Sequence, residues 1–253
     1  MIRSQFPEAV YRLKPDEEYN FDCHPGVPCF TECCRMLELA LTPYDVLRLR
    51  KGTGLTSQEL HDRYIIEERG EQDMFPKYYL TMIDDGRASC AFVDKNGCQI
   101  YEHRPGACRA YPLGRAAVKT RSGELNQHFV LLKETHCKGF AEPCKQTPLS
   151  YSKQQGLIAY NKYNDALAAL IQHENIRKGL FMPSDEQLRL YTLALYNLDV
   201  FRADIVSGVI AVGDYPEEIL HDDEALLLFS ISWLQEQYFS DPSKSDDINT
   251  SFA

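Results

Sequence analysis

The 253-residue sequence contains no apolar run near the length of about 18 residues that a membrane-spanning helix needs. Residues 1–8 also lack the apolar core of an export signal. Both features predict a cytoplasmic protein with no membrane partner. In a reducing compartment disulfides are rare, and thiols stay available to metals.

Positive charge is sparse and scattered. Lys and Arg total 27 against 37 Asp and Glu, which gives a formal net charge of −10, and we find no basic patch along the chain. An acidic surface repels phosphate backbones, so the composition argues against nucleic acid as a partner.

Common catalytic signatures are also missing. The sequence has no Ser-His-Asp order, no P-loop and no G-x-G-x-x-G. Acidic runs such as Glu67-Glu68 are typical of solvated faces. No segment repeats at a fixed period, which excludes a solenoid.

Cysteine is the residue that stands out. All nine cysteines precede residue 145, in turn-rich clusters, and an odd count in a reducing compartment disfavours disulfides. Such clustering predicts a metal site. The candidate ligands are Cys23, Cys29, Cys33, Cys34, Cys90, Cys98, Cys108 and Cys137. Cys144 lies outside these clusters. An unligated thiol and a metal ligand are equally good interpretations of this residue.

The adjacent pair Cys33-Cys34 constrains the site. If residues 29–33 are helical, Cys29 and Cys33 share one face, whereas Cys33 and Cys34 diverge on a helix or a strand. One tetrahedral ion therefore rarely takes both thiols. Two alternatives follow: two nearby centres that divide the pair, or one centre with the second thiol outside it.

Charged neighbours complete the candidate site. Arg104 and Arg109 flank Cys108, and we expect at least one to hydrogen-bond a ligating sulfur or a neighbouring carbonyl as part of cofactor binding. His24, His103 and His136 lie near cysteines, and imidazole can complete a zinc site with three cysteines. We favour a polar surface or supporting role for them, because the chain has enough cysteines.

Local patterns predict an α+β fold. We expect residues 29–50 to form a helix entry followed by a second short helix that Thr42 caps. We expect further helices over 56–69, 150–174, 184–207 and 216–239, with Thr56 and Ser184 as N-caps. Asp94-Lys95-Asn96-Gly97 predicts a hairpin turn within 88–101, and residues 115–119 and 125–132 a second strand pair. Aromatics at helical spacing in 196–202 indicate core, with a docking surface for a protein partner on the C-terminal helices as the alternative.

We expect three regions: a small, irregular cysteine-cluster metal domain with short hairpins over 1–148, a helical region packed on it over 149–239, and a disordered tail over 240–253.

Three motifs carry a family resemblance: Cys29-x3-Cys33-Cys34, the Cys90 to Tyr101 hairpin, and Arg104-Pro105-x2-Cys108-Arg109-Ala110-Tyr111-Pro112. Together with the turn at Cys137, they resemble the CxxCxxCC cysteine-cluster (YkgJ-like) family of zinc- or iron-chelating proteins over about residues 20–140. Five residues separate Cys23 from Cys29, where the family usually has two.

The resemblance implies a metal site, and some members are called Fe–S oxidoreductases. Flagellin lysine N-methylases of the same broad family imply an iron–sulfur cluster used with S-adenosylmethionine, although the chain shows no methyl-donor motif. Our first hypothesis is an iron–sulfur protein with redox or methyl-transfer chemistry, since the number of thiols favours iron over a single zinc ion. The second is a non-enzymatic module with structural zinc or a role in metal delivery.

Overall fold

The computed structural model describes residues 10–119 and 125–240, and its fold is α+β, as the sequence predicts. Its strands are β1 (Val10–Leu13), β2 (Tyr19–Asn20), β3 (Ile65–Glu68), β4 (Lys77–Leu80), β5 (Met82–Ile83), β6 (Ser89–Cys90), β7 (Val93–Asp94), β8 (Gly97–Cys98), β9 (Leu113–Lys119), β10 (Leu125–Leu132) and β11 (Lys145–Gln146). Its α-helices are α1 (Pro43–Thr53), α2 (Ser57–Tyr64), α3 (Gly106–Ala110), α4 (Pro148–Gln154), α5 (Leu157–Ile171), α6 (Glu174–Arg177), α7 (Asp185–Tyr196), α8 (Leu198–Val206) and α9 (Asp223–Phe239). Short 3₁₀ helices are η1 (Glu32–Cys34), η2 (Tyr101–His103), η3 (Gly139–Ala141) and η4 (Glu217–Leu220).

The strands form one three-stranded antiparallel sheet, β1-β10-β9, and four two-stranded ribbons. The predicted strand pair is confirmed as β9 and β10, although the turn at 120–124 lies outside the described residues. The predicted hairpin is confirmed at β7 and β8, where Asp94 pairs with Gly97 and Gly97 takes a φ of 117° that favours glycine.

The three predicted N-caps are confirmed. Thr42, Thr56 and Ser184 each accept a hydrogen bond from the third helical residue, which in turn bonds back to the cap. These capping boxes form within four residues of chain, so local sequence is enough to specify them.

Several predicted helix bounds are wrong. The helix expected over 56–69 ends at Tyr64, because Ile65 and Ile66 continue as β3 and pair with β4. The helix expected over 150–174 divides at Gly156, whose φ is +67°, and the one over 184–207 divides at Asn197.

The expectation that residues 29–33 are helical is also wrong. Cys29 lies in a turn, and only η1 is helical there. Thr31, the residue before η1, takes a left-handed φ of 70°, which an α-helix running from Cys29 to Cys33 would not allow.

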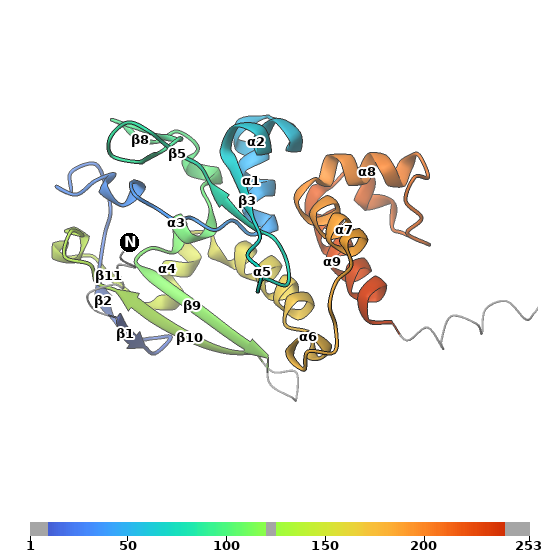
Figure 1. Cartoon of the computed structure of the whole chain (residues 1–253). Coiled ribbons are helices and arrows are strands. Elements are labelled where there is room, and N and C mark those ends of the chain that lie inside the picture. The colour runs from blue at the N-terminus through green and yellow to red at the C-terminus, as the bar shows by residue number, and fades with distance from the viewer. Residues whose placement is uncertain (1–9, 120–124, 241–253) are drawn as a thin grey trace, which may run out of the picture.

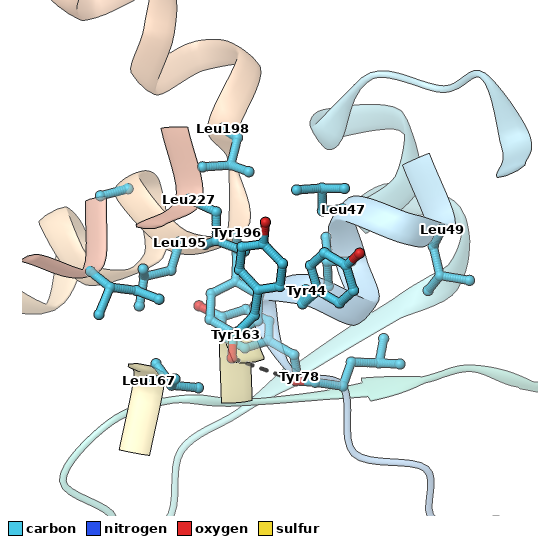
Figure 2. Close-up of a cluster of buried hydrophobic side chains, with 14 of the residues drawn as sticks. Tyr44, Leu47, Leu49, Tyr78, Tyr163, Leu167, Leu195, Tyr196, Leu198 and Leu227 are labelled. Atoms are coloured by element: carbon cyan, nitrogen blue, oxygen red, sulfur yellow. Dashed lines mark hydrogen bonds between the residues drawn. The ribbon is translucent and has the colours of Figure 1, made fainter. Parts of the chain in front are cut away.

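The main core joins elements from both sides of residue 148. Tyr44 of α1 stacks on Tyr163 of α5 with ring centroids 4.2 Å apart, and Tyr78 of β4 stacks on Tyr196 of α7 at 3.7 Å (Figure 2). The aromatics at 196–202 are therefore core, since Tyr196 and Phe201 are both buried. The boundary at 148 stays a prediction.

A second, smaller core lies beneath the three-stranded sheet, where Phe21, Phe129 and Tyr151 are buried together. In Figure 1 the strands β2, β5, β8 and β11 lie at the end of the molecule away from helices α7, α8 and α9. No helix in the described ranges is long and apolar enough to cross a membrane.

A candidate metal centre built from cysteines

All nine cysteines lie within the described residues and are free thiols. Eight of them come from four separate segments: the loop before η1 with η1 itself, the ribbons β5-β6 and β7-β8, helix α3, and the loop before η3. Six of the eight sequence-predicted ligands fall into two groups of three, and the other two are the adjacent pair Cys33-Cys34.

The first neighbourhood, called here the Cys137 group, contains Cys23, Cys29 and Cys137. Desolvation by burial raises the pKa of Cys23 to about 11, and the neighbouring thiols of Cys33, Cys29 and Cys137 add smaller contributions. The backbone N–H of Lys138 donates to Cys29 Sγ at 3.0 Å, which joins two segments 109 residues apart.

Backbone contacts fix this neighbourhood. The N–H of Asp22 donates to the carbonyl oxygen of Gly139 at 3.1 Å, and the N–H of Phe21 donates to that of Cys144 at 2.9 Å. A Cβ on Gly139 would lie 2.4 Å from the Asp22 oxygen, so only glycine allows this approach. The segment that precedes Cys23 is thereby held beside the one that follows Cys137.

The second neighbourhood, called here the Cys108 group, contains Cys90, Cys98 and Cys108. Burial raises the pKa of Cys108, and the thiols of Cys90, Cys98 and Cys33 add to that shift. Burial also raises the pKa of Cys90, which is only 9% exposed, and the Cys98 thiol adds to it. These thiols pack against the main core, whereas Cys137 packs against the smaller one.

The pair Cys33-Cys34 lies on η1. A hydrogen bond between the two thiols, followed by burial, raises the pKa of Cys33. Cys33 also acts electrostatically on Cys23 and Cys137 in one group and on Cys108 in the other.

Arg104 and Arg109 are both buried, and they hold the backbone between Cys98 and Cys108. Arg104 Nη1 donates to the carbonyl oxygen of Tyr101 at 2.7 Å, and Arg109 Nη2 donates to that of Glu102. The expected hydrogen bond to a neighbouring carbonyl is confirmed. Burial raises the pKa of Cys98 while the two guanidinium charges oppose that shift, which places positive charge near the thiol.

Asp45 supports the same loop, and sequence reasoning missed it. Its Oδ2 accepts from Thr42 N at 2.8 Å and completes the capping box, while its Oδ1 accepts from Gly106 N at 2.7 Å. Burial raises the pKa of Asp45, and these hydrogen bonds oppose the shift. The only local signal was Asp45's place three residues after Thr42; its second contact lies 61 residues away.

The three candidate histidines make polar or packing contacts within the protein, and the supporting role favoured from the sequence stays a prediction. His24 Nδ1 accepts from Gly26 N, and its Nε2 lies 3.5 Å from Glu142. His136 pairs with Glu134 at 3.7 Å, and His103 packs against Gly52 of α1. Cys144 accepts from Gln146 Nε2 at 3.3 Å.

Among the described residues, no group of three or more His, Cys, Asp or Glu side chains is arranged to hold a metal ion. The donor set nevertheless fits zinc or iron, since thiolates are preferred ligands of both and arginine donors lie beside them. Metal binding is coupled to thiol deprotonation and local folding, so ligation requires the thiols of a group to draw together.

Fold and cysteine arrangement together define an α+β cysteine-cluster protein. Residues 22–145 match the family model CxxCxxCC, described as "Putative zinc- or iron-chelating domain". This match confirms the resemblance carried by the cysteine motifs. No curated protein and no solved structure matches the chain.

Proposed function

We propose that this chain binds zinc or iron through the thiolates of its clustered cysteines. The observation that carries the proposal is that the cysteine-bearing segments are tied together: Lys138, which follows Cys137, donates its N–H to Cys29 Sγ, and two buried arginines hold the backbone between Cys98 and Cys108. The family description, zinc- or iron-chelating, supports the same chemistry.

The residues proposed to hold the metal are the eight sequence-predicted cysteines, with Arg104 and Arg109 offsetting thiolate charge near Cys98. Four thiolates around a divalent ion leave a net charge near −2, which a partly buried site holds only with nearby donors. A bound metal would cross-link loops that have little regular structure of their own, and an iron–sulfur cluster would add an electron carrier.

The number of thiols bears on the metal. One all-cysteine zinc ion uses about four thiolates, and the chain offers twice that. This excess favours an iron–sulfur cluster or more than one ion. Redox or methyl-transfer chemistry with S-adenosylmethionine would require the cluster; structural zinc or metal delivery would not.

The test is metal analysis of the full chain purified without oxygen, with its absorption spectrum. We expect zinc or iron in the wild type, with visible absorption if a cluster is present and none for zinc. Cys108→Ser should lower the metal content, whereas Cys144→Ser, the matched control outside the eight, should keep it. A wild-type chain that carries neither metal and takes up neither zinc(II) nor iron with sulfide would overturn the proposal.

A further inference from the structure

We propose that Gln155 is a positioning residue for the cysteine site. It holds the buried guanidinium groups of Arg104 and Arg109 without neutralising them, so that their positive charge stays available to the thiolates of Cys98 and Cys108. Gln155 lies at the turn between α4 and α5, outside the residues 22–145 that match the family model. The inference rests on the proposed function and adds to it a residue from the helical part of the chain.

Gln155 binds both arginines of the motif around Cys108. Its side-chain oxygen accepts from Arg104 Nη2 at 2.5 Å, and its carbonyl oxygen accepts from Arg109 Nη1 at 2.8 Å. These contacts span 51 and 46 residues of sequence, so no local pattern indicates them. A single residue thus holds both ends of the motif.

The turn places the backbone of Gln155 against Arg109. Gln155 ends α4, and the carbonyl group of a residue that ends a helix has no partner inside that helix. Gly156 follows with a φ of +67°, which favours glycine, and begins α5. A Cβ on Gly156 would lie 3.5 Å from Arg109 Nη1, so the turn packs directly against the guanidinium.

The two guanidinium groups are buried among uncharged acceptors. Both arginines are only 8% exposed, and an arginine side chain stays protonated in a protein. Within the described part of the chain, every hydrogen bond that they donate ends on an uncharged oxygen. These oxygens are the backbone carbonyls of Tyr101, Glu102 and Gln155, the side-chain amide of Gln155 and the phenol of Tyr160.

The buried carboxylate that supports the same loop does not pair with either arginine. Asp45 accepts from the N–H and the hydroxyl of Thr42 and from the N–H of Gly106. Burying a charge without an opposite charge beside it is costly. The loop therefore carries two positive charges that suit an anion bound there.

Cysteine thiolates are anions at the right place in the chain. Arg109 directly follows Cys108 on α3, and Arg104 holds the carbonyl of Tyr101, three residues after Cys98. Both guanidinium charges also act on the Cys98 thiol. Thiolates around a divalent ion keep excess negative charge, which nearby donors stabilise. A carboxylate at position 155 would take up part of the positive charge on which the thiolates depend.

The test substitutes Gln155 in the full chain. Gln155→Glu keeps the acceptor for Arg104 and adds a negative charge, whereas Gln155→Met removes the acceptor and adds no charge. Gln154→Glu is the matched control, because it makes the same change one residue away, where the side chain accepts from Gln146. Zinc(II) affinity is measured without oxygen by competition with a chelator, and the stability of the metal-free chain by urea unfolding.

We expect the two substitutions of Gln155 to affect affinity and stability differently. Gln155→Glu should weaken zinc(II) binding about tenfold, because it offsets one of two positive charges beside the thiolates. Its metal-free form should be at least as stable as the wild type, since a carboxylate bonds arginine more strongly than an amide does. Gln155→Met should lower the stability of the metal-free chain, because Arg104 loses an acceptor. The control should change neither quantity.

Four results would overturn the inference. They are wild-type affinity in Gln155→Glu, lower stability of that variant, unchanged stability of Gln155→Met, and an equal loss of affinity in Gln154→Glu. The last result would assign the effect to net charge alone. A wild-type chain that takes up no zinc(II) also overturns it, and the iron measurement proposed above then decides whether the chain binds metal at all.

Discussion

The guanidinium of Arg109 donates from Nε to the phenolic oxygen of Tyr160 at 3.1 Å, and both side chains are buried. The Tyr160 hydroxyl in turn donates to the carbonyl oxygen of Arg104 at 2.9 Å. One residue of α5 thus supports both ends of the Arg-Pro-x-x-Cys-Arg motif around Cys108. The helical part of the chain therefore positions the cysteine loop as well as packing beside it.

Tyr160→Phe should destabilise the protein by about 1–3 kcal/mol, because it leaves a buried donor and a buried carbonyl without their partner. Urea unfolding followed by circular dichroism measures the change. Tyr215→Phe, at an exposed tyrosine, is the control and should shift the free energy of unfolding by less than about 0.5 kcal/mol. Equal stability of Tyr160→Phe and the wild type would show that this hydroxyl does not support the loop.

Asp45→Asn tests the link between α1 and α3. The amide can still accept from Gly106, but its NH₂ group replaces the oxygen that accepts from Thr42, so we expect a loss of about 1–2 kcal/mol. Glu59→Gln is the matched control, since Glu59 holds the same capping position in α2 without a contact to α3. It should be nearly neutral, because Gln also serves in a capping box. Equal effects of the two substitutions would contradict the special role of Asp45.

Gly139→Ala should lower both stability and metal content. The added methyl would lie 2.4 Å from the Asp22 oxygen and 2.8 Å from the Phe21 ring, so the segments that carry Cys23 and Cys137 must move apart. We expect a cost of about 1–3 kcal/mol in the free energy of unfolding. Gly70→Ala is the control, because its nearest neighbour is the flexible side chain of Asp73 at 3.2 Å. Full metal content in Gly139→Ala would show that this approach does not position the thiols.

His61 should make stability depend on pH. Burial lowers its pKa below the usual 6.5, and the carboxylates of Glu67, Asp62 and Asp199 only partly oppose the shift. The unfolded chain therefore takes up the proton first as pH falls. The contribution of His61 is fully present above about pH 6.5 and is lost as pH falls through its lower folded-state pKa.

His61→Phe keeps a ring against Tyr78, which His61 now meets edge-on with centroids 5.7 Å apart, and removes the titrating group. Urea unfolding at a series of pH values should show a smaller loss of stability in acid for His61→Phe than for the wild type. Metal content is checked at each pH so that release from the cysteines is not mistaken for this effect. Identical pH profiles would exclude His61 as the source.

The amino-acid sequence by itself determined the features whose partners lie within a few residues. Thr42, Thr56 and Ser184 close capping boxes three residues on, and Asp94 to Gly97 closes the β7-β8 hairpin. The cysteine motifs likewise indicated a metal-chelating family, because spacing around turns is a local property. Such hydrogen bonds form or fail within one short segment, so they can be recognised without the fold.

Only the tertiary structure decided how these pieces meet. The second oxygen of Asp45 reaches Gly106 across 61 residues, and Lys138 reaches Cys29 across 109. The helical spacing of apolar residues over 56–69 predicted a helix through Ile65. That residue instead begins β3, because the strand depends on pairing with β4. The bridge that joins Arg35 to Ser89 is likewise visible only in the fold, because long-range packing, not chain spacing, sets which segments are neighbours.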